Sequence, residues 1–211
     1  MNTQETVRNV LIAVDPQNDF ITGSLAVDGG EQVIAPLNEM TEIVRATGGD
    51  VAFTRDWHPA ETPHFNTWPV HCVQDTEGAA FASELTIKPT DIIISKGTGQ
   101  TDGYSGTEGV GPNGETLEAL IEPRSKEERV RVFIGGLATD YCVLATALAL
   151  AEQFKDNERV TFYLIRDAVR AVNLEPDAGE KAIRTMEDAT IVAMTVAEIK
   201  QMFFEKERIQ L

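Results

Sequence analysis

The chain has 211 residues, of which 42% are hydrophobic, and its 34 acidic and 18 basic residues give a formal charge of −16 at pH 7. A chain of this length can bury its apolar surface in one core, so we expect a single domain over residues 1–211. The acidic excess repels phosphate backbones and anionic lipid headgroups, so nucleic acid and membranes are excluded as expected partners.

The first nine residues are mostly polar and do not resemble a signal peptide. No later apolar run reaches the length of about 18 residues that a membrane-spanning helix needs. We therefore expect a cytoplasmic protein.

Short apolar runs rich in β-branched residues predict six buried strands. They are residues 10–14, 51–54, 92–94, 130–134, 160–165 and 191–194. Helical patterns cover residues 32–47, 116–121, 141–154, 177–186 and 196–204, with a further helix expected around 78–85 and a solvated turn at 123–129. This alternation predicts a three-layer α/β/α fold, in which helices cover both faces of a mainly parallel six-stranded sheet.

Reactive side chains follow four of the predicted strands. Asp15 follows the first strand, Asp56 the second and Lys96 the third. After the fourth strand, a Gly-Gly pair leads to Cys142. Because a parallel sheet binds ligands at the carboxyl ends of its strands, we expect these four residues to share one site.

All three histidines lie in one short stretch that begins with an aspartate: Asp56, His58, His64 and His71. Imidazole nitrogen and carboxylate oxygen are the ligands that borderline divalent ions take. The stretch therefore predicts a site for one divalent metal ion, with zinc as the first choice and iron or manganese as alternatives. Three prolines within it favour a loop over a helix. The competing interpretation is a polar turn without a metal.

Cys142 lies near the start of the predicted helix 141–154, with Thr139 or Asp140 expected at the capping position. The positive end of the helix dipole should then lower the pKa of the thiol. Lys96 would add a second stabilising charge for the thiolate, and Asp15 could accept the thiol proton. The competing interpretation of Cys142 is a small apolar residue packed in a helix.

Two further features have structural interpretations. Cys72 is best explained as a packed structural thiol, although a soft metal ligand next to His71 is the alternative. The glycine-rich segment 97–103 matches a dinucleotide-binding loop poorly, because its third glycine comes one residue late. We interpret it as a turn that lets Tyr104 approach a small pocket.

Several separate segments, in the same order along the chain, resemble the nicotinamidases, the metal-containing branch of the isochorismatase-like cysteine hydrolases. These segments are residues 15–20, 56–59, 68–72, 96–97, 102–106 and 135–143. The resemblance implies hydrolysis of nicotinamide to nicotinate and ammonia through a cysteine thioester, with the metal orienting the pyridine ring. It also implies a small-molecule partner, nicotinamide or a close analogue, and a role in NAD salvage. A homo-oligomer is left open.

The resemblance assigns roles to individual positions. The catalytic triad matches Asp15, Lys96 and Cys142. The metal ligands match Asp56, His58 and His71, with His64 as a further histidine found in some members. The oxyanion hole matches the backbone N–H groups of Ala138 and Cys142, with a cis peptide expected between Leu137 and Ala138. The pocket walls match Phe20, Leu25, Trp68, Tyr104 and Tyr141.

Some positions depart from the family pattern. Only six residues separate His64 from His71, fewer than in several relatives, so His64 is either a direct ligand or a neighbour of the site. Residues 22–24 carry one glycine where others have two, and Tyr141 replaces a histidine of some members, so the preference among nicotinamide analogues is open. Two other functions are also open: hydrolysis by a metal-activated water, and a metal-binding or scaffold module without activity.

Overall fold

The computed structural model describes residues 5–209. Six strands form one sheet in the order β3-β2-β1-β4-β5-β6, and every neighbouring pair in it is parallel. The strands are β1 (Thr6–Val14), β2 (Asp50–Asp56), β3 (Ile92–Lys96), β4 (Glu128–Leu137), β5 (Val160–Arg170) and β6 (Val192–Met194). The prediction of a mainly parallel six-stranded sheet is therefore confirmed.

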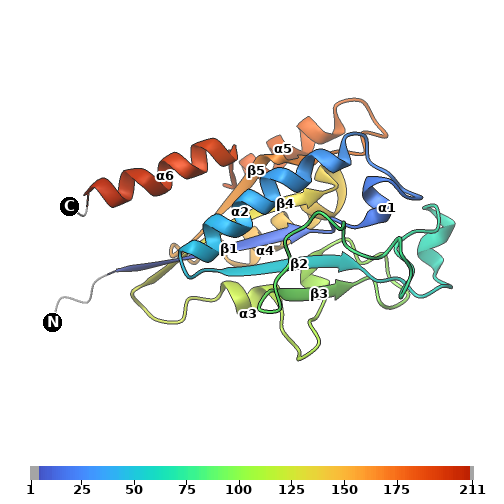
Figure 1. Ribbon diagram of the computed structural model, residues 1–211, viewed down its shortest axis with the longest axis horizontal. Helices are drawn as coiled ribbons and strands as arrows, with labels where there is room; N and C mark the ends of the chain where they lie inside the picture. The colour runs from blue at the N-terminus through green and yellow to red at the C-terminus, as the bar shows by residue number, and fades with distance from the viewer. Residues whose placement is uncertain (1–4, 210–211) are drawn as a thin grey trace.

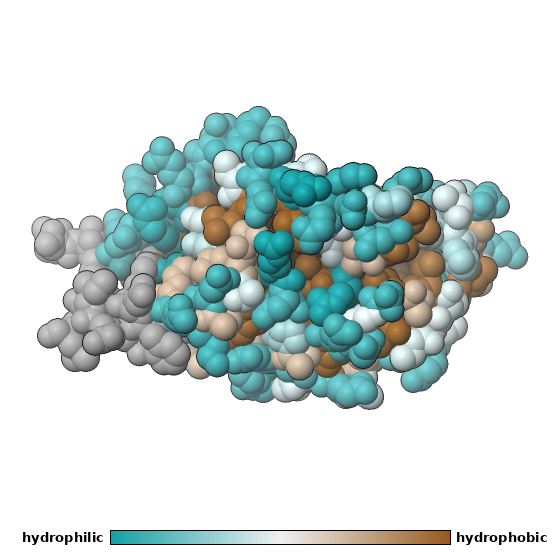
Figure 2. Space-filling view, turned by 90° about the horizontal axis from the view of Figure 1, so that it is seen from above, coloured by the Kyte–Doolittle hydropathy of each residue, from teal (hydrophilic) through white to brown (hydrophobic). Residues whose placement is uncertain are grey.

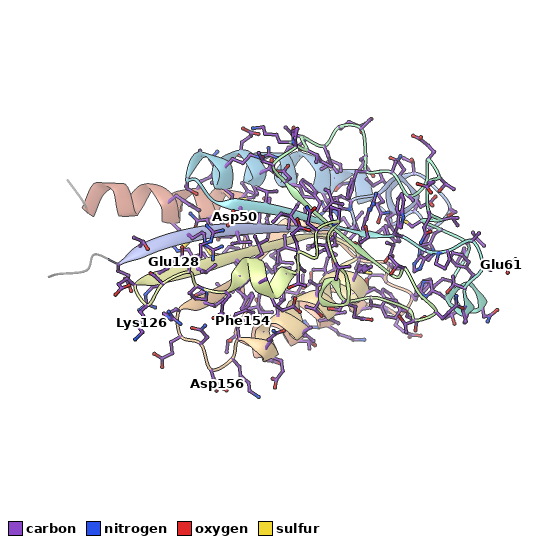
Figure 3. The ribbon with its side chains drawn as sticks, turned by 90° about the horizontal axis from the view of Figure 1, so that it is seen from below. Asp50, Glu61, Lys126, Glu128, Phe154 and Asp156 are labelled. Carbon is purple, nitrogen blue, oxygen red and sulfur yellow. The ribbon has the colours of Figure 1, made fainter. Side chains whose placement is uncertain are left out.

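Helices cover both faces of this sheet and produce the expected three layers. One face packs against α2 (Ile34–Ala46) and α6 (Val196–Ile209). The other packs against α3 (Leu117–Ile121), α4 (Leu144–Gln153) and α5 (Ala178–Asp188). Figure 3 shows α2 and α6 above the sheet, and α3 and α4 below it.

The carboxyl ends of the strands gather at one end of the molecule, opposite the start of β1 and the end of α6 (Figure 1). The short helix α1 (Asn18–Ile21) and the 3-10 turn η2 (Pro63–Asn66) also lie at this end. Both were missed in the sequence, because four residues are too few to show a helical period. This end of the sheet is where the site is expected.

Charged residues make up 25% of the sequence, and the hydrophilic character that they give the chain is visible on its surface. Hydrophilic residues prevail on the face seen in Figure 2, and apolar residues show in patches between them. Within residues 5–209, no helix combines the length and the apolar character needed to cross a bilayer.

The helix expected around residues 78–85 is wrong, since turns occupy this segment. Its backbone groups bond to the chain that follows β1: the N–H groups of Asn18 and Asp19 donate to the carbonyls of Ala80 and Gly78, each at 2.9 Å. A Cβ on Gly78 would also lie 2.1 Å from the Asp19 carboxylate. Long-range pairing has replaced the local hydrogen bonds of a helix.

Other boundaries moved by a few residues. The expected helix 32–47 is divided into a 3-10 turn at Gly30–Val33 and α2, and α6 extends to Ile209. The solvated turn ends before Glu128, where β4 begins. The expected helix 141–154 begins instead as a wide π-helical turn, η4 (Thr139–Val143), before α4 starts at Leu144.

Candidate active site

Lys96 is the centre of a buried group of charged and nucleophilic side chains. Its Nζ lies 2.8 Å from Asp15 Oδ2, 2.5 Å from Asp56 Oδ1 and 3.4 Å from Cys142 Sγ. None of these four residues is more than 6% exposed. The structure thus brings together the four residues that the strand-end argument placed at one site.

Asp15 is held in an unusual backbone conformation. Its φ of 47° lies in the left-handed region, where a residue other than glycine is strained. Thr54 on the neighbouring strand β2 stabilises it through two contacts: the Thr54 carbonyl accepts the Asp15 N–H at 3.2 Å, and the Thr54 hydroxyl donates to Asp15 Oδ1 at 2.6 Å. Strained residues held by their surroundings are typical of functional sites.

The charges of the group set one another's pKa values. Burial raises the pKa of Asp15, and the nearby Asp56 carboxylate adds to the rise against the opposing effect of Lys96. Burial opposes the charge of Lys96, but the two carboxylates outweigh it and raise the pKa of that ammonium well above its usual range. Lys96 is therefore a permanent cation between two carboxyl groups.

Burial raises the pKa of the Cys142 thiol well above its usual value, and the charge of Lys96 only partly opposes this effect. The expected lowering by the helix dipole is therefore wrong. Two carboxylates within 4.8 Å of the sulfur, from Asp15 and Asp56, also disfavour a thiolate. Burial therefore favours the neutral thiol over the thiolate, so nucleophilic attack calls for a base.

The capping residues expected for this helix are also wrong. The residue before the π-helical turn is Ala138, and no side chain caps it. The Asp140 carboxylate instead accepts the backbone N–H groups of Val172 and Asn173, both at 2.9 Å, which ties the turn to the segment after β5. The peptide bond between Leu137 and Ala138 is cis, as the resemblance implied.

The three histidine side chains converge beside Asp56. Each is buried. Each offers one ring nitrogen, and these three nitrogens all lie within 4.8 Å of one another. Asp56 Oδ2 lies 3.7 Å from His58 Nε2 and 3.8 Å from His71 Nε2. Burial lowers the pKa of His71, which keeps its imidazole neutral and able to donate a lone pair.

Each Nδ1 faces an oxygen acceptor. His58 Nδ1 lies 3.0 Å from the Gly97 carbonyl, and His71 Nδ1 lies 2.7 Å from the Pro69 carbonyl. A carbonyl oxygen only accepts, so each Nδ1 donates, which places the lone pair of a neutral ring on Nε2. Within the described part of the chain, His58 Nε2 is buried and has no hydrogen-bond partner. This orphaned atom fits a divalent metal ion ligated by imidazole and carboxylate.

The glycine-rich segment 97–103 leads directly to Tyr104, which lines a cavity, and its first glycine also lies against His58. A Cβ on Gly97 would lie 2.5 Å from the His58 ring, and the φ of +63° at this position favours glycine. Gly97 is therefore required by the close approach of His58.

This contact yields a prediction for Gly97→Ala. The added methyl group clashes with His58 and occupies a left-handed backbone conformation, so the free energy of unfolding should fall by about 2 kcal/mol. Chemical denaturation measures it. Gly99→Ala is the matched control, because a Cβ there meets no atom within 4 Å. Equal stability of the two variants would contradict the role assigned to Gly97.

A cavity lies between the Cys142 sulfur and the histidines. Its lining includes Cys142, Asp56, His64 and His71. The five pocket residues named from the sequence also line it: Phe20, Leu25, Trp68, Tyr104 and Tyr141. Trp68 Nε1 donates to the Tyr104 hydroxyl at 2.8 Å, and the Trp68 ring meets Tyr141 edge-on at 4.9 Å. These aromatic walls suit a flat heteroaromatic ligand.

Three residues near the cavity were missed in the sequence. Val172 lines the cavity just after β5, and the strand-end rule could have identified it. The buried Gln17 side chain accepts the Asp56 N–H and donates to the Asp56 carbonyl, both at 2.8 Å, and so fixes the backbone of that aspartate. Asp102 contacts His64 Nδ1 at 2.7 Å, and nothing in the local sequence indicates this pairing.

Comparisons with known proteins agree with this geometry. The profile of the isochorismatase domain matches residues 9–198. The nicotinamidase of Escherichia coli (strain K12) is 30% identical over 211 residues, covering 89% of this chain and 95% of the relative.

Two solved structures share the fold. Pyrazinamidase of Pyrococcus horikoshii in complex with zinc has a TM-score of 0.73 and 34% identity, over 89% of this chain and 99% of that one. PnC1 from L. infantum in complex with nicotinate has a TM-score of 0.74 and 32% identity, over 92% of this chain and 98% of that one.

Proposed function

This chain belongs to the isochorismatase family, and on that premise we propose that it hydrolyses nicotinamide to nicotinate and ammonia with Cys142 as the nucleophile. The observation that carries the proposal is the position of Lys96 Nζ, which contacts both Asp15 and Cys142 beside a cavity walled by histidines and aromatic rings. Covalent amide hydrolysis requires a cysteine whose sulfur lies close to a general base and to a cation.

The substrate ring lies between the aromatic walls, with its carboxamide toward Cys142. A divalent cation held by Asp56, His58, His64 and His71 would supply a Lewis-acidic partner for the pyridine nitrogen and so fix the orientation of the ring. Zinc is the first choice, since the Pyrococcus horikoshii relative contains it, and iron and manganese accept the same ligands.

The first half of the reaction forms a thioester. Asp15 takes the proton of the Cys142 thiol, and Lys96 stabilises the resulting thiolate. The sulfur attacks the carboxamide carbon, and the carbonyl oxygen becomes an oxyanion. The backbone N–H groups of Ala138 and Cys142, which both belong to cavity-lining residues, stabilise this oxyanion by about 2.7–4 kcal/mol each. Asp15 then donates its proton to the nitrogen, the C–N bond breaks and ammonia leaves.

The second half hydrolyses the thioester. The carboxylate of Asp15 is free again and takes a proton from a water that attacks the thioester carbon. The C–S bond breaks, Asp15 returns the proton to the sulfur, and nicotinic acid leaves and loses its own proton to water to become nicotinate. Lys96 remains protonated throughout, because the two carboxylates beside it raise the pKa of its ammonium.

The test is to incubate the metal-loaded protein with nicotinamide and to measure nicotinate and ammonia. We expect the two products in equal amounts. Benzamide has the same shape but lacks the ring nitrogen, so kcat/KM should fall by about 100-fold or more, because a site built for a polar atom rejects the analogue that lacks it. If no ammonia is released with zinc, iron or manganese, the proposed function is overturned.

A further inference from the structure

We propose that Asp102 is a positioning residue of the metal site, and that its carboxylate orients His64 so that this histidine becomes a direct ligand. The inference rests on the proposed function and extends it, since it names the side chain that orients one of the three histidines toward the ion. The contact between Asp102 Oδ1 and His64 Nδ1, at 2.7 Å, carries it.

The geometry of His64 fits ligation. Its ring stacks on His58 with 4.6 Å between the centroids, and it lies 5.2 Å from the ring of His71. The His64 side chain is only 3% exposed, whereas the Asp102 side chain is 56% exposed. Asp102 therefore holds Nδ1 of the ring from the solvent side, which leaves Nε2 as the nitrogen available to a cation.

Asp102 differs from the partners of the other two histidines. His58 and His71 each donate to a neutral backbone carbonyl, of Gly97 and Pro69 respectively. An ionised acceptor makes a stronger hydrogen bond than a neutral one and increases the basicity of the ligating nitrogen. His64 is thus the histidine whose affinity for a cation depends most on a single side chain.

The role of this pair is orientation rather than folding. A side-chain contact with one exposed partner contributes little to stability. His64 lies on the short turn η2, whereas Asp102 lies on the segment after β3, so the contact joins two loops. The hydrogen bond from Trp68 to Tyr104 joins the same two loops at the cavity wall. Asp102 therefore connects the position of a metal ligand to the wall that contacts substrate.

The test measures the affinity for Zn²⁺ by competition with a chromophoric chelator, so it needs no enzyme activity. Asp102→Ala removes both the acceptor and its charge and should weaken binding by about 10–100-fold. Asp102→Asn keeps an acceptor oxygen and should lose less. Glu61→Gln is the matched control, since Glu61 is an exposed acid at the same end of the molecule (Figure 3). The affinity of this variant for Zn²⁺ should equal that of the wild type.

A double-mutant cycle separates positioning from a general effect of charge. If Asp102 acts through His64, then Asp102→Ala should weaken binding in the wild type but have no further effect in the His64→Ala background. The absorption spectrum of bound Co²⁺ should change in the same way in both single variants, because each loses the same ligand.

The outcomes are distinct. Weaker binding by Asp102→Ala with no further loss in the His64→Ala background supports the inference. Wild-type affinity of Asp102→Ala, or equal losses in both backgrounds, overturns the inference alone. If the wild type itself binds no Zn²⁺, Co²⁺, Fe²⁺ or Mn²⁺, the proposed metal site is overturned and the role of Asp102 with it.

Discussion

Replacing Cys142 by alanine should lower kcat for nicotinamide hydrolysis by about 10⁴-fold or more, because a covalent route cannot proceed without its nucleophile. The expected loss exceeds the contribution of any single oxyanion donor. The Cys142 side chain is small and makes no metal contact in the proposed site, so folding and metal content should be retained. Ammonia release and metal content measured on the same sample test this.

Cys72→Ala is the matched control for this variant. Cys72 is the other buried cysteine, and it is absent from the lining of the cavity. It should therefore keep activity near that of the wild type. If Cys142→Ala also kept near-normal activity, the attacking group would be a water activated by the metal, and the thioester route would be abandoned.

Replacing Asp15 by asparagine should lower kcat/KM by about 10²–10⁴-fold, the usual contribution of a general base. The loss should be large here because burial raises the pKa of the Cys142 thiol, so little thiolate forms without a base. Burial also raises the pKa of Asp15. Wild-type kcat/KM should consequently fall as the pH is lowered through that pKa, where the carboxylate takes up a proton. The residual activity of Asp15→Asn should lack this acid limb.

The control for Asp15→Asn addresses its backbone conformation. Asp75 is another aspartate with a positive φ, of 62°, and it does not line the cavity. Asp75→Asn should therefore keep wild-type kcat/KM. A similar loss in both variants would point to an effect of the left-handed backbone, and an unchanged acid limb in Asp15→Asn would assign that titration to another group.

The arrangement of the strands and of the residues that follow them was predictable from the sequence. Buried parallel strands appear as short β-branched runs, and all of their carboxyl ends lie at one edge of the sheet. This rule alone brought Asp15, Asp56, Lys96 and Cys142 together. The histidines were equally visible, because their residue type is rare in this chain and all three lie within one loop.

Features that depend on contacts between distant segments were not predictable. The turns at residues 78–85 pair with residues 16–19, and no local pattern reports such pairing. Gln17 and Asp102 act on residues 39 and 38 positions away, respectively. The pKa of Cys142 was predicted in the wrong direction because the sequence shows the start of a helix but not the depth of burial. Desolvation outweighs a helix dipole at a fully buried atom.

The central claim is that the carboxamide carbon of nicotinamide becomes bonded to the sulfur of Cys142 during turnover. Acid quenching during the first turnovers, followed by proteolysis and mass spectrometry, tests it most directly, since thioesters survive in acid. We predict one nicotinoyl group on the peptide that contains Cys142 and none on the peptide that contains Cys72. Steady release of nicotinate with no nicotinoyl group on Cys142 at any time of quenching would contradict the account.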